Sequence, residues 1–347
     1  MRLKLPPRGR RVQQALAVGA APALVMGLAL VAISNPANAS HTDTQSNASP
    51  DRAKPAFVSK SVSDQTSRAA RLREYWTPER MANAVPADRL TQGAVPTAAP
   101  STDTMKATTG SQPVQPTAAA SSARKVRKSK TIGKVFFKTR SGIDMVCSGA
   151  AVNSKAKNMV MTAGHCVHSG PGKGWHKNWI FVPGYGPGNT ARNGIYPATR
   201  LVALRGWIKK ENFNDDVALA LVKPGRGTNT KLVRKVGGYG TQFGRSYRRT
   251  MTAIGYSQLG FKGDKQKHCR KMTHRRRGTG QIEMRCRVLT PGASGGPWVK
   301  GKVAAGKGFV NGINSNVNKR RHPTVIRSSY FGKDVYRMYQ SFRKTKH

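Results

Sequence analysis

The sequence predicts an all-β domain that begins near residue 131 and continues to the C-terminus. In this part the chain consists of short runs of β-branched and aromatic residues separated by glycine, proline and asparagine. A helical pattern occurs near the end, in residues 333–342, where apolar side chains recur on one face. No internal repeat is present in the sequence. The expected strands are residues 135–137, 159–161, 180–182, 217–222, 251–254, 282–288 and 308–310, and glycine-rich loops are expected at 183–189 and 237–240.

The first 39 residues have the pattern of a signal peptide. Five arginine and lysine residues precede an apolar run at 15–33, and Ala37 and Ala39 are small residues at the two positions that a signal peptidase recognises. A single membrane anchor is the alternative, because the apolar run is nearly long enough to span a bilayer. The cleavage site favours the signal peptide. We therefore expect a secreted, extracellular protein with no stable membrane anchor once the signal is removed.

Residues 40–123 form a second part, rich in Ala, Ser, Thr, Pro and Gln. Most of this stretch is not expected to bury a core, and its best local element is a short helix within residues 67–84. A propeptide that is removed on maturation and a retained linker are both consistent with its position. The basic run at 124–130 is the expected cleavage site in the first case. The third part, residues 124–347, is the expected folded domain.

The four cysteines lie beyond the signal peptide and are even in number, as expected for disulfides in an exported chain. Four cysteines allow three pairings. We expect the local one, Cys147 with Cys166 and Cys269 with Cys286, because each bond would then join neighbouring strands. A zinc site that includes nearby histidines is the alternative, but the sequence has no C-x-x-C spacing. We therefore expect no metal and no organic cofactor.

The net charge of +47 belongs mostly to the third part, which has only seven acidic residues. Such a charge attracts acidic proteins, anionic cell-wall polymers and nucleic acid in a salt-dependent way. The charge alone does not indicate which of these is the partner. The basic run at 262–277 brackets Cys269 and precedes Ser294 in the sequence. It lacks the interleaved aromatic residues typical of single-stranded nucleic-acid sites, so no specific nucleic-acid binding is expected. A role in recruiting acidic partners and a merely solubilising role are both consistent with it.

Two short segments carry residues suited to nucleophilic hydrolysis. His165 lies in Thr-Ala-Gly-His-Cys (162–166) and Ser294 lies in Gly-Ala-Ser-Gly-Gly-Pro (292–297). A histidine supplies a general base, and a serine between glycines supplies a nucleophile. The backbone amides of Gly292 and Ser294 are expected to form an oxyanion hole, because glycine permits the backbone conformation that this requires. A turn with no catalytic role is the alternative for the serine segment alone.

The third catalytic residue is expected to be a buried carboxylate that orients the imidazole. Asp216 immediately precedes the apolar run 217–222, which would carry it into the interior, and Asp215 is its neighbouring competitor. Side chains alternate along a strand, so only one of the two can reach His165. We choose Asp216.

The order His, Asp, Ser along the chain, with these flanking residues, resembles the chymotrypsin-like (trypsin-like) serine peptidases. Residues 134–137, 146–150, 160–166 and 181–185 resemble the secreted bacterial and fungal branch that includes the V8-like glutamyl endopeptidases. The resemblance extends from about residue 131 to the C-terminus. It implies two six-stranded antiparallel β-barrels with the site between them, and proteolysis through an acyl-enzyme on Ser294.

Several positions depart from the best-known members of this family. Ala293 stands where the digestive enzymes have the aspartate that pairs with a new N-terminus, so activation by that ion pair is not expected. Val288 stands where trypsin-type enzymes have the aspartate that binds Arg or Lys, so the specificity is not expected to be trypsin-like. In the glutamyl branch a threonine and a histidine line the pocket, and their counterparts here are Leu289 and Asn314. An apolar or small substrate side chain in the pocket is thus as consistent with the sequence as glutamate is.

The sequence therefore supports a secreted serine endopeptidase that acts on proteins or peptides, with a monomer as the default state. The alternative is a catalytically silent cationic protein that binds anionic surfaces on a peptidase scaffold. Because His165, Asp216, Ser294 and Gly292 are all present, the enzyme is favoured.

Overall fold

The computed structural model describes residues 56–62, 71–72, 74–91, 105–117, 129–186, 191–225, 227–318 and 324–346. The expected signal peptide and most of the basic run at 124–130 lie outside these residues. In the described ranges, no helix combines the length and the apolar character needed to cross a membrane.

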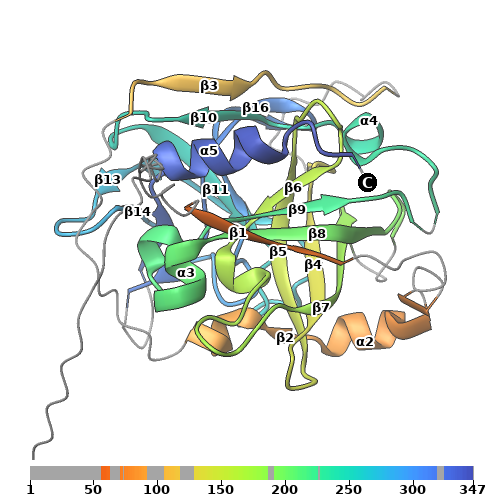
Figure 1. Ribbon diagram of the computed structural model, residues 1–347. Coiled ribbons are helices and arrows are strands. Elements are labelled where there is room, and N and C mark those ends of the chain that lie inside the picture. The colour runs from red at the N-terminus through yellow and green to blue at the C-terminus, as the bar shows by residue number, and fades with distance from the viewer. Residues whose placement is uncertain are drawn as a thin grey trace, which may run out of the picture. The chain divides into compact units, whose positions relative to one another are not determined.

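Six antiparallel strands form a closed barrel in the first half of the domain (Figure 1). The pairing order is β8-β7-β4-β5-β6-β9, and a further pairing between β8 and β9 closes the barrel. Five of these strands are almost wholly buried along their length, because alternate side chains fill the interior while other elements cover the outside. The strands are β4 (Ile132–Lys138), β5 (Asp144–Val152), β6 (Met159–Thr162), β7 (Lys177–Pro183), β8 (Tyr196–Leu204) and β9 (Ala218–Val222).

The second half consists of two sheets that lie against each other. One has the order β12-β11-β15-β16-β10-β3 and the other has the order β13-β14-β18-β17. Contacts of β16 with β18 and of β12 with β14 join them. Their bounds are β3 (Thr108–Ser111), β10 (Gly240–Phe243), β11 (Thr250–Gly255), β12 (Lys267–Met272), β13 (His274–Arg275), β14 (Gln281–Arg285), β15 (Pro297–Ala304), β16 (Lys307–Ile313), β17 (Asn316–Val317) and β18 (Val325–Ser329).

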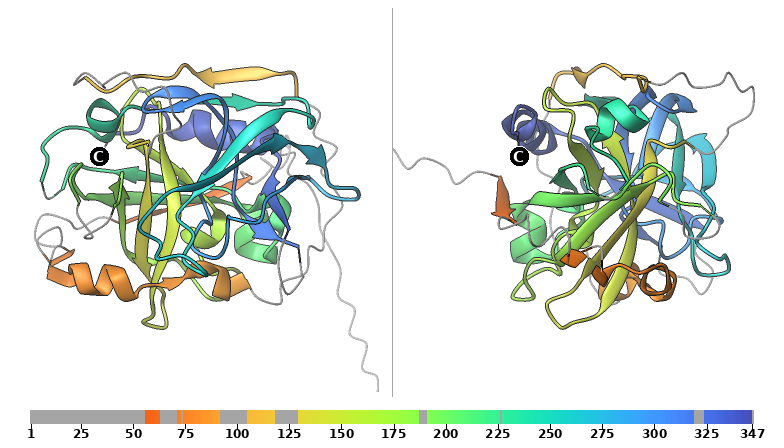
Figure 2. Two further views of the ribbon diagram at one scale, coloured as in Figure 1. Left: turned by 180° about the vertical axis from the view of Figure 1, so that it is seen from behind. Right: turned by 90° about the vertical axis from the view of Figure 1, so that its right-hand side faces the viewer.

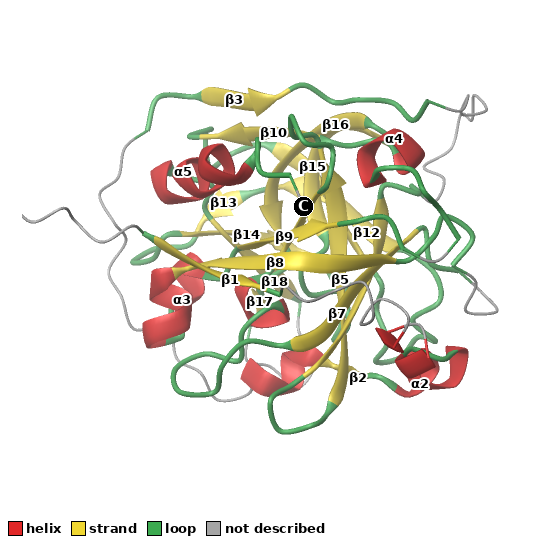
Figure 3. Ribbon diagram, turned by 45° about the vertical axis from the view of Figure 1, so that its right-hand side comes forward, coloured by secondary structure: helices red, strands yellow, loops and turns green. Residues whose placement is uncertain are grey.

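The all-β class with a short C-terminal helix is confirmed, and Figure 3 shows the strands at the centre with short helices outside them. The helix α5 (Lys333–Phe342) spans the expected residues, with Val335 and Met338 buried. Each expected strand overlaps an observed one. The strand expected at 282–288 is shorter than expected, because β14 ends at Arg285. Two short helices, α3 (Arg205–Lys210) and α4 (Leu232–Val236), were not expected.

The N-terminal segment packs on this domain, which its composition did not predict (Figure 2). Its elements are β1 (Phe57–Ser61), α2 (Pro78–Asn83), β2 (Val85–Pro86) and the 3₁₀ turn η1 (Ala87–Thr91), followed by β3. β1 pairs with β8, β2 pairs with β5, and β3 pairs with β10. Trp76, Met81 and Ala87 are buried in the main core, so single apolar residues anchor a segment that is polar on average.

Candidate active site

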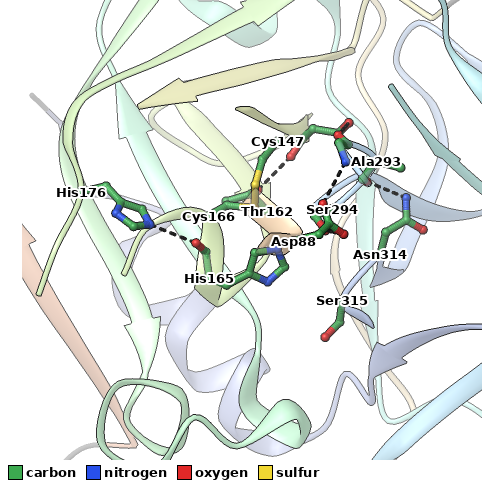
Figure 4. Close-up of a disulfide and its surroundings, with 12 residues drawn as sticks. Asp88, Cys147, Thr162, His165, Cys166, His176, Ala293, Ser294, Asn314 and Ser315 are labelled. Atoms are coloured by element: carbon green, nitrogen blue, oxygen red, sulfur yellow. Dashed lines mark hydrogen bonds between the residues drawn. A yellow bond between two sulfur atoms is a disulfide. The ribbon is translucent and has the colours of Figure 1, made fainter. Parts of the chain in front are cut away.

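His165 lies in the 3₁₀ turn η2 (Gly164–Cys166), directly after β6. A disulfide joins Cys166 to Cys147 of β5 and ties this turn to the barrel. His176 Nε2 donates a hydrogen bond to the carbonyl oxygen of His165 at 3.0 Å (Figure 4). The His165 ring is fully buried, so both its backbone and its side chain are fixed before any substrate binds.

Asp216 lies between the turn η3 (Phe213–Asp215) and β9, and its carboxylate holds the imidazole. Its Oδ2 accepts a hydrogen bond from His165 Nδ1 at 2.9 Å, and its Oδ1 accepts one from the backbone amide of His165 at 2.8 Å. Ser315 Oγ donates a third hydrogen bond to Oδ2 at 2.6 Å. The side chains of both Asp216 and His165 have 0% exposure, so water does not screen their interaction.

Burial alone favours the neutral imidazole, but the carboxylates of Asp216, Asp88 and Glu211 together raise the pKa of His165 above its ordinary value. The pKa of His176 moves the other way, to about 3, because complete burial outweighs its hydrogen bond to His165. His176 is therefore neutral at ordinary pH, and its Nε2 carries the proton that the carbonyl oxygen accepts. It positions His165 without competing as a base.

Asp215, the competing carboxylate, points away from His165. Its Oδ2 accepts a hydrogen bond from Asn212 Nδ2 at 2.8 Å. It lines a separate cavity of about 180 Å³ that also includes Asp334. Burial, and then the charge of Asp334, raise the pKa of Asp215 from 3.8 to about 6.

Ser294 and Gly292 lie on a tight loop between β14 and β15. The backbone carbonyl of Ser294 accepts a hydrogen bond from the amide of Ser148 at 2.7 Å, which ties the loop to the first barrel. Gly292 has a φ of 98°, a conformation that side chains rarely adopt. A Cβ atom at this position would also lie 2.8 Å from the carbonyl oxygen of Tyr256. The loop geometry therefore requires glycine, as the sequence led us to expect.

The carboxylate of Asp88, in the N-terminal segment, contacts this loop. Its Oδ1 accepts a hydrogen bond from Ser294 Oγ at 2.7 Å, and its Oδ2 accepts one from the backbone amide of Gly292 at 2.8 Å (Figure 4). His165 Nε2, the nitrogen not bound to Asp216, is buried and has no hydrogen-bond partner among the described residues. The Ser294 hydroxyl is thus bound to Asp88 rather than to the imidazole.

A small pocket opens beside Ser294, and Leu289 and Asn314 are among the residues that line it. The amide of Asn314 is fully engaged within the protein. Its Nδ2 donates to the carbonyl oxygens of Ile254 and Ala293, both at 2.9 Å, and its Oδ1 accepts from Trp298 Nε1 at 2.8 Å. Val288, the other expected pocket residue, is not among the described residues that line the pocket.

The second disulfide joins Cys269 of β12 to Cys286, directly after β14. Both bonds follow the local pairing. Cys147, Cys166 and His165 also lie close enough together to suggest a metal site. The two sulfur atoms form the disulfide, and His165 Nδ1 binds Asp216.

Sequence reasoning missed three residues of this site, namely Asp88, His176 and Ser315. Ser315 had a signal, since it directly follows Asn314 in the expected pocket string. His176 carries no motif, and it reaches His165 because its amide donates to the carbonyl oxygen of Val167 and His168 bridges to Trp175. Asp88 is separated from Ser294 by 206 residues and lies in a stretch whose composition predicted no core.

Comparisons with known proteins identify the fold. No family model matches the chain, and no curated protein matches it. Among solved structures it is similar to a thermostable serine protease, AL20, from an extremophilic microorganism, with 31% identity and a TM-score of 0.58 over 62% of this chain and 98% of that one. Protease Anisep from Arthrobacter nicotinovorans matches at 28% identity and a TM-score of 0.57, over 67% of this chain and 99% of its own. A Glu endopeptidase solved in complex with MPD matches at 16% identity and a TM-score of 0.49, over 68% of this chain and 98% of its own.

The chain belongs to the serine proteases of the chymotrypsin-like fold. The class of enzyme is accordingly a serine peptidase, which acts on peptide bonds.

Proposed function

We propose that the protein is a secreted serine endopeptidase whose catalytic triad is His165, Asp216 and Ser294. Ser294 Oγ attacks the peptide carbonyl while His165 Nε2 takes its proton and later delivers it to the leaving amine. Asp216 holds the proton on Nδ1, so that Nε2 is free to act as the base, and it stabilises the imidazolium that forms. The amides of Gly292 and Ser294 stabilise the oxyanion.

The observation that carries this proposal is the convergence of three groups on one point. The fully buried Asp216 carboxylate fixes the tautomer of His165, and the ring of His165, whose Nε2 has no partner among the described residues, lies beside Asp88 and Ser294 (Figure 4). The carboxylate of Asp88 links Ser294 Oγ to the amide of Gly292. One small acyl group can therefore contact the nucleophile and an oxyanion donor at the same time, within the 2.7–3.1 Å range that stabilisation requires.

For specificity, we propose a small or medium uncharged substrate side chain. Apart from Asp88, the residues that line the pocket beside Ser294 carry no charge: Leu289, Thr290, Ala293, Asn314, Ser315, Asn316, Val317 and Ile326. Among the described residues that line this pocket, none other than Asp88 is an acid that could bind Arg or Lys, and none is a cation that could bind Glu. Asn314 has no free donor for a substrate carboxylate, since both of its Nδ2 hydrogens are used internally.

Export, maturation and charge-driven association complete the proposal. The signal at 1–39 directs export, and the basic run at 124–130 is the proposed cleavage region. The edge strand β12, in the basic run at 262–277, has mostly exposed side chains and a covalent tie through Cys269. We propose that it associates with acidic proteins or an anionic wall polymer in a salt-dependent way, and that the enzyme is a monomer.

The test is mass-spectrometric cleavage profiling of the processed chain against a diverse peptide library, with the Ser294→Ala variant as control. The proposal predicts cleavage by the wild type alone, after uncharged residues. Cleavage after Lys, Arg or Glu would contradict the proposed specificity. If the correctly processed wild type and the variant are equally inactive, the catalytic proposal is wrong and the cationic binding protein takes its place.

A further inference from the structure

We propose that Asp88 is a tethered inhibitor, whose side-chain carboxylate occupies the catalytic centre and keeps the enzyme inactive until the N-terminal segment is removed. This inference rests on the proposed function of Ser294 and Gly292. It assigns residues 75–91 a role that the composition of this stretch did not indicate, and it names the group through which that role is exerted.

The carboxylate blocks two parts of the catalytic machinery together. Oδ1 takes the hydrogen bond of Ser294 Oγ, so the hydroxyl proton points to Asp88 instead of His165 Nε2. Oδ2 binds the amide of Gly292, where the oxyanion of a substrate would lie. Both contacts are charge-assisted hydrogen bonds, which are stronger than those between neutral groups. A substrate carbonyl therefore cannot reach Ser294 while Asp88 is in place.

Asp88 binds without being consumed. The group beside Ser294 Oγ is a side-chain carboxylate rather than a peptide carbonyl, and a carboxylate anion is a poor electrophile for acyl transfer. It is also distinct from the triad carboxylate, since Asp216 already holds His165 Nδ1 and Asp88 contacts the nucleophile. Asp88 thus has no place in the reaction scheme.

Anchors on the flanking segment keep Asp88 in place. Trp76 is 2% exposed, packs on Phe136 of β4, and donates from Nε1 to the carbonyl oxygen of Asn178 at 2.7 Å. The carboxylate of Asp144 accepts hydrogen bonds from the hydroxyl of Tyr75 and, at 3.0 Å, from Nε of Arg80. These contacts fix helix α2 and its N-terminal flank against the first barrel.

Closer to Asp88, the backbone itself is attached. β2 pairs in parallel with β5, with Val85 opposite Met145 and Pro86 opposite Val146. Gln258 Nε2 donates to the carbonyl oxygen of Ala84 at 3.2 Å, and Ala87 is fully buried. The turn η1, which carries Asp88, contacts η2, which carries His165. Because its neighbours are ordered, the carboxylate binds with little further loss of conformational entropy.

Cleavage near residues 124–128 would break the covalent link between Asp88 and the catalytic domain and leave the first described residues of that domain anchored. Ser129 is held in place, since its amide donates to Gln266 Oε1 at 3.0 Å and its hydroxyl accepts from Tyr239 at 2.8 Å. A new N-terminus just before Ser129 would thus keep its position. The segment that carries Asp88 would then be held by non-covalent contacts alone, which allows it to dissociate.

The test measures how fast a fluorophosphonate labels Ser294 in the uncleaved chain, whose intact mass shows that residues 75–91 are still attached. Asp88→Ala removes the carboxylate, and Asp88→Asn keeps its shape while removing its charge. Glu79→Gln is the matched control, because Glu79 is an exposed carboxylate in α2 of the same segment. Loss of a charge-assisted hydrogen bond predicts labelling about ten- to a hundredfold faster in both Asp88 variants and unchanged in Glu79→Gln.

Two results would overturn the proposal, and they are distinguishable. If the uncleaved wild type is labelled as fast as both Asp88 variants and as fast as the same protein after cleavage within residues 124–128, Asp88 does not inhibit and the serine peptidase stands. If none of these proteins is labelled, including the cleaved one, Ser294 is not a reactive nucleophile and both proposals fail.

Discussion

Replacing Asp216 by asparagine is expected to lower kcat by about four powers of ten without unfolding the domain. The asparagine Oδ1 can still accept from the backbone amide of His165, so the turn η2 keeps its anchor. Its Nδ2 group, however, faces His165 Nδ1 as a donor. The imidazole must then carry its proton on Nε2, where it can no longer accept the proton of Ser294.

The magnitude follows from the separation of the two groups. Asp216 Oδ2 lies 2.9 Å from His165 Nδ1, and both side chains are fully buried. At an effective dielectric constant of about 20, Coulomb's law gives about 6 kcal/mol of stabilisation for the imidazolium that forms in the transition state. Each 1.36 kcal/mol is a factor of ten in rate, so the loss is about 10⁴.

The assay compares kcat and KM on a peptide chosen by cleavage profiling, with the segment before Ser129 removed and Ser294→Ala as the background. Asp215→Asn is the matched control, because Asp215 is the adjacent carboxylate and points away from His165. We expect that control to change kcat less than about twofold. A folded Asp216→Asn variant that keeps more than about a tenth of the wild-type kcat would refute the role given to Asp216.

Three further predictions concern the loop, a buried acid and a disulfide. Gly292→Ala is expected to lower kcat by about 10² and also the Tm, because the φ of 98° and the nearby Tyr256 carbonyl both exclude a Cβ; an unchanged kcat would contradict the oxyanion role. Burial raises the pKa of Asp215 to about 6, so the folded state binds that proton more tightly than the unfolded state does, and this contribution to stability is lost as pH rises through 6. Asp215→Asn should therefore raise the unfolding free energy at pH 8 by up to about 3 kcal/mol, seen as a higher Tm, and have no effect near pH 4. Cys269 and Cys286 are 17 residues apart, and replacing both by serine should lower the unfolding free energy, measured in urea, by about 3 kcal/mol. A loss below about 0.5 kcal/mol would contradict a structural role for this disulfide.

Local patterns explain what the sequence predicted well. The helix at 333–342 was visible because its apolar residues recur with helical period, and both disulfides join cysteines that are close in the sequence. Asp216 was chosen over Asp215 because it directly precedes the apolar run at 217–222, and in the structure Asp216 is hydrogen-bonded to His165 while Asp215 binds Asn212. In each case the information lies within about twenty residues of chain.

Long-range contacts explain what the sequence did not predict. The strand β5 contains small residues at 148–151, which carry little β signal of their own and are buried because β4 and β6 pair on either side. Trp76 and Asp88 lie in a polar, proline-containing stretch, and their partners Asn178 and Ser294 are 102 and 206 residues away. No periodicity or motif connects such pairs, because tertiary folding alone brings them together.

The measurement that tests the central claim most directly is the site of covalent labelling in the processed chain. After reaction with a fluorophosphonate, the intact mass should increase by one adduct, and peptide mapping should place that adduct on Ser294. The same treatment should leave Ser294→Ala unmodified and should label Asp216→Asn much more slowly. An adduct on another residue, or equal labelling of Ser294→Ala, would contradict the assignment of Ser294 as the nucleophile.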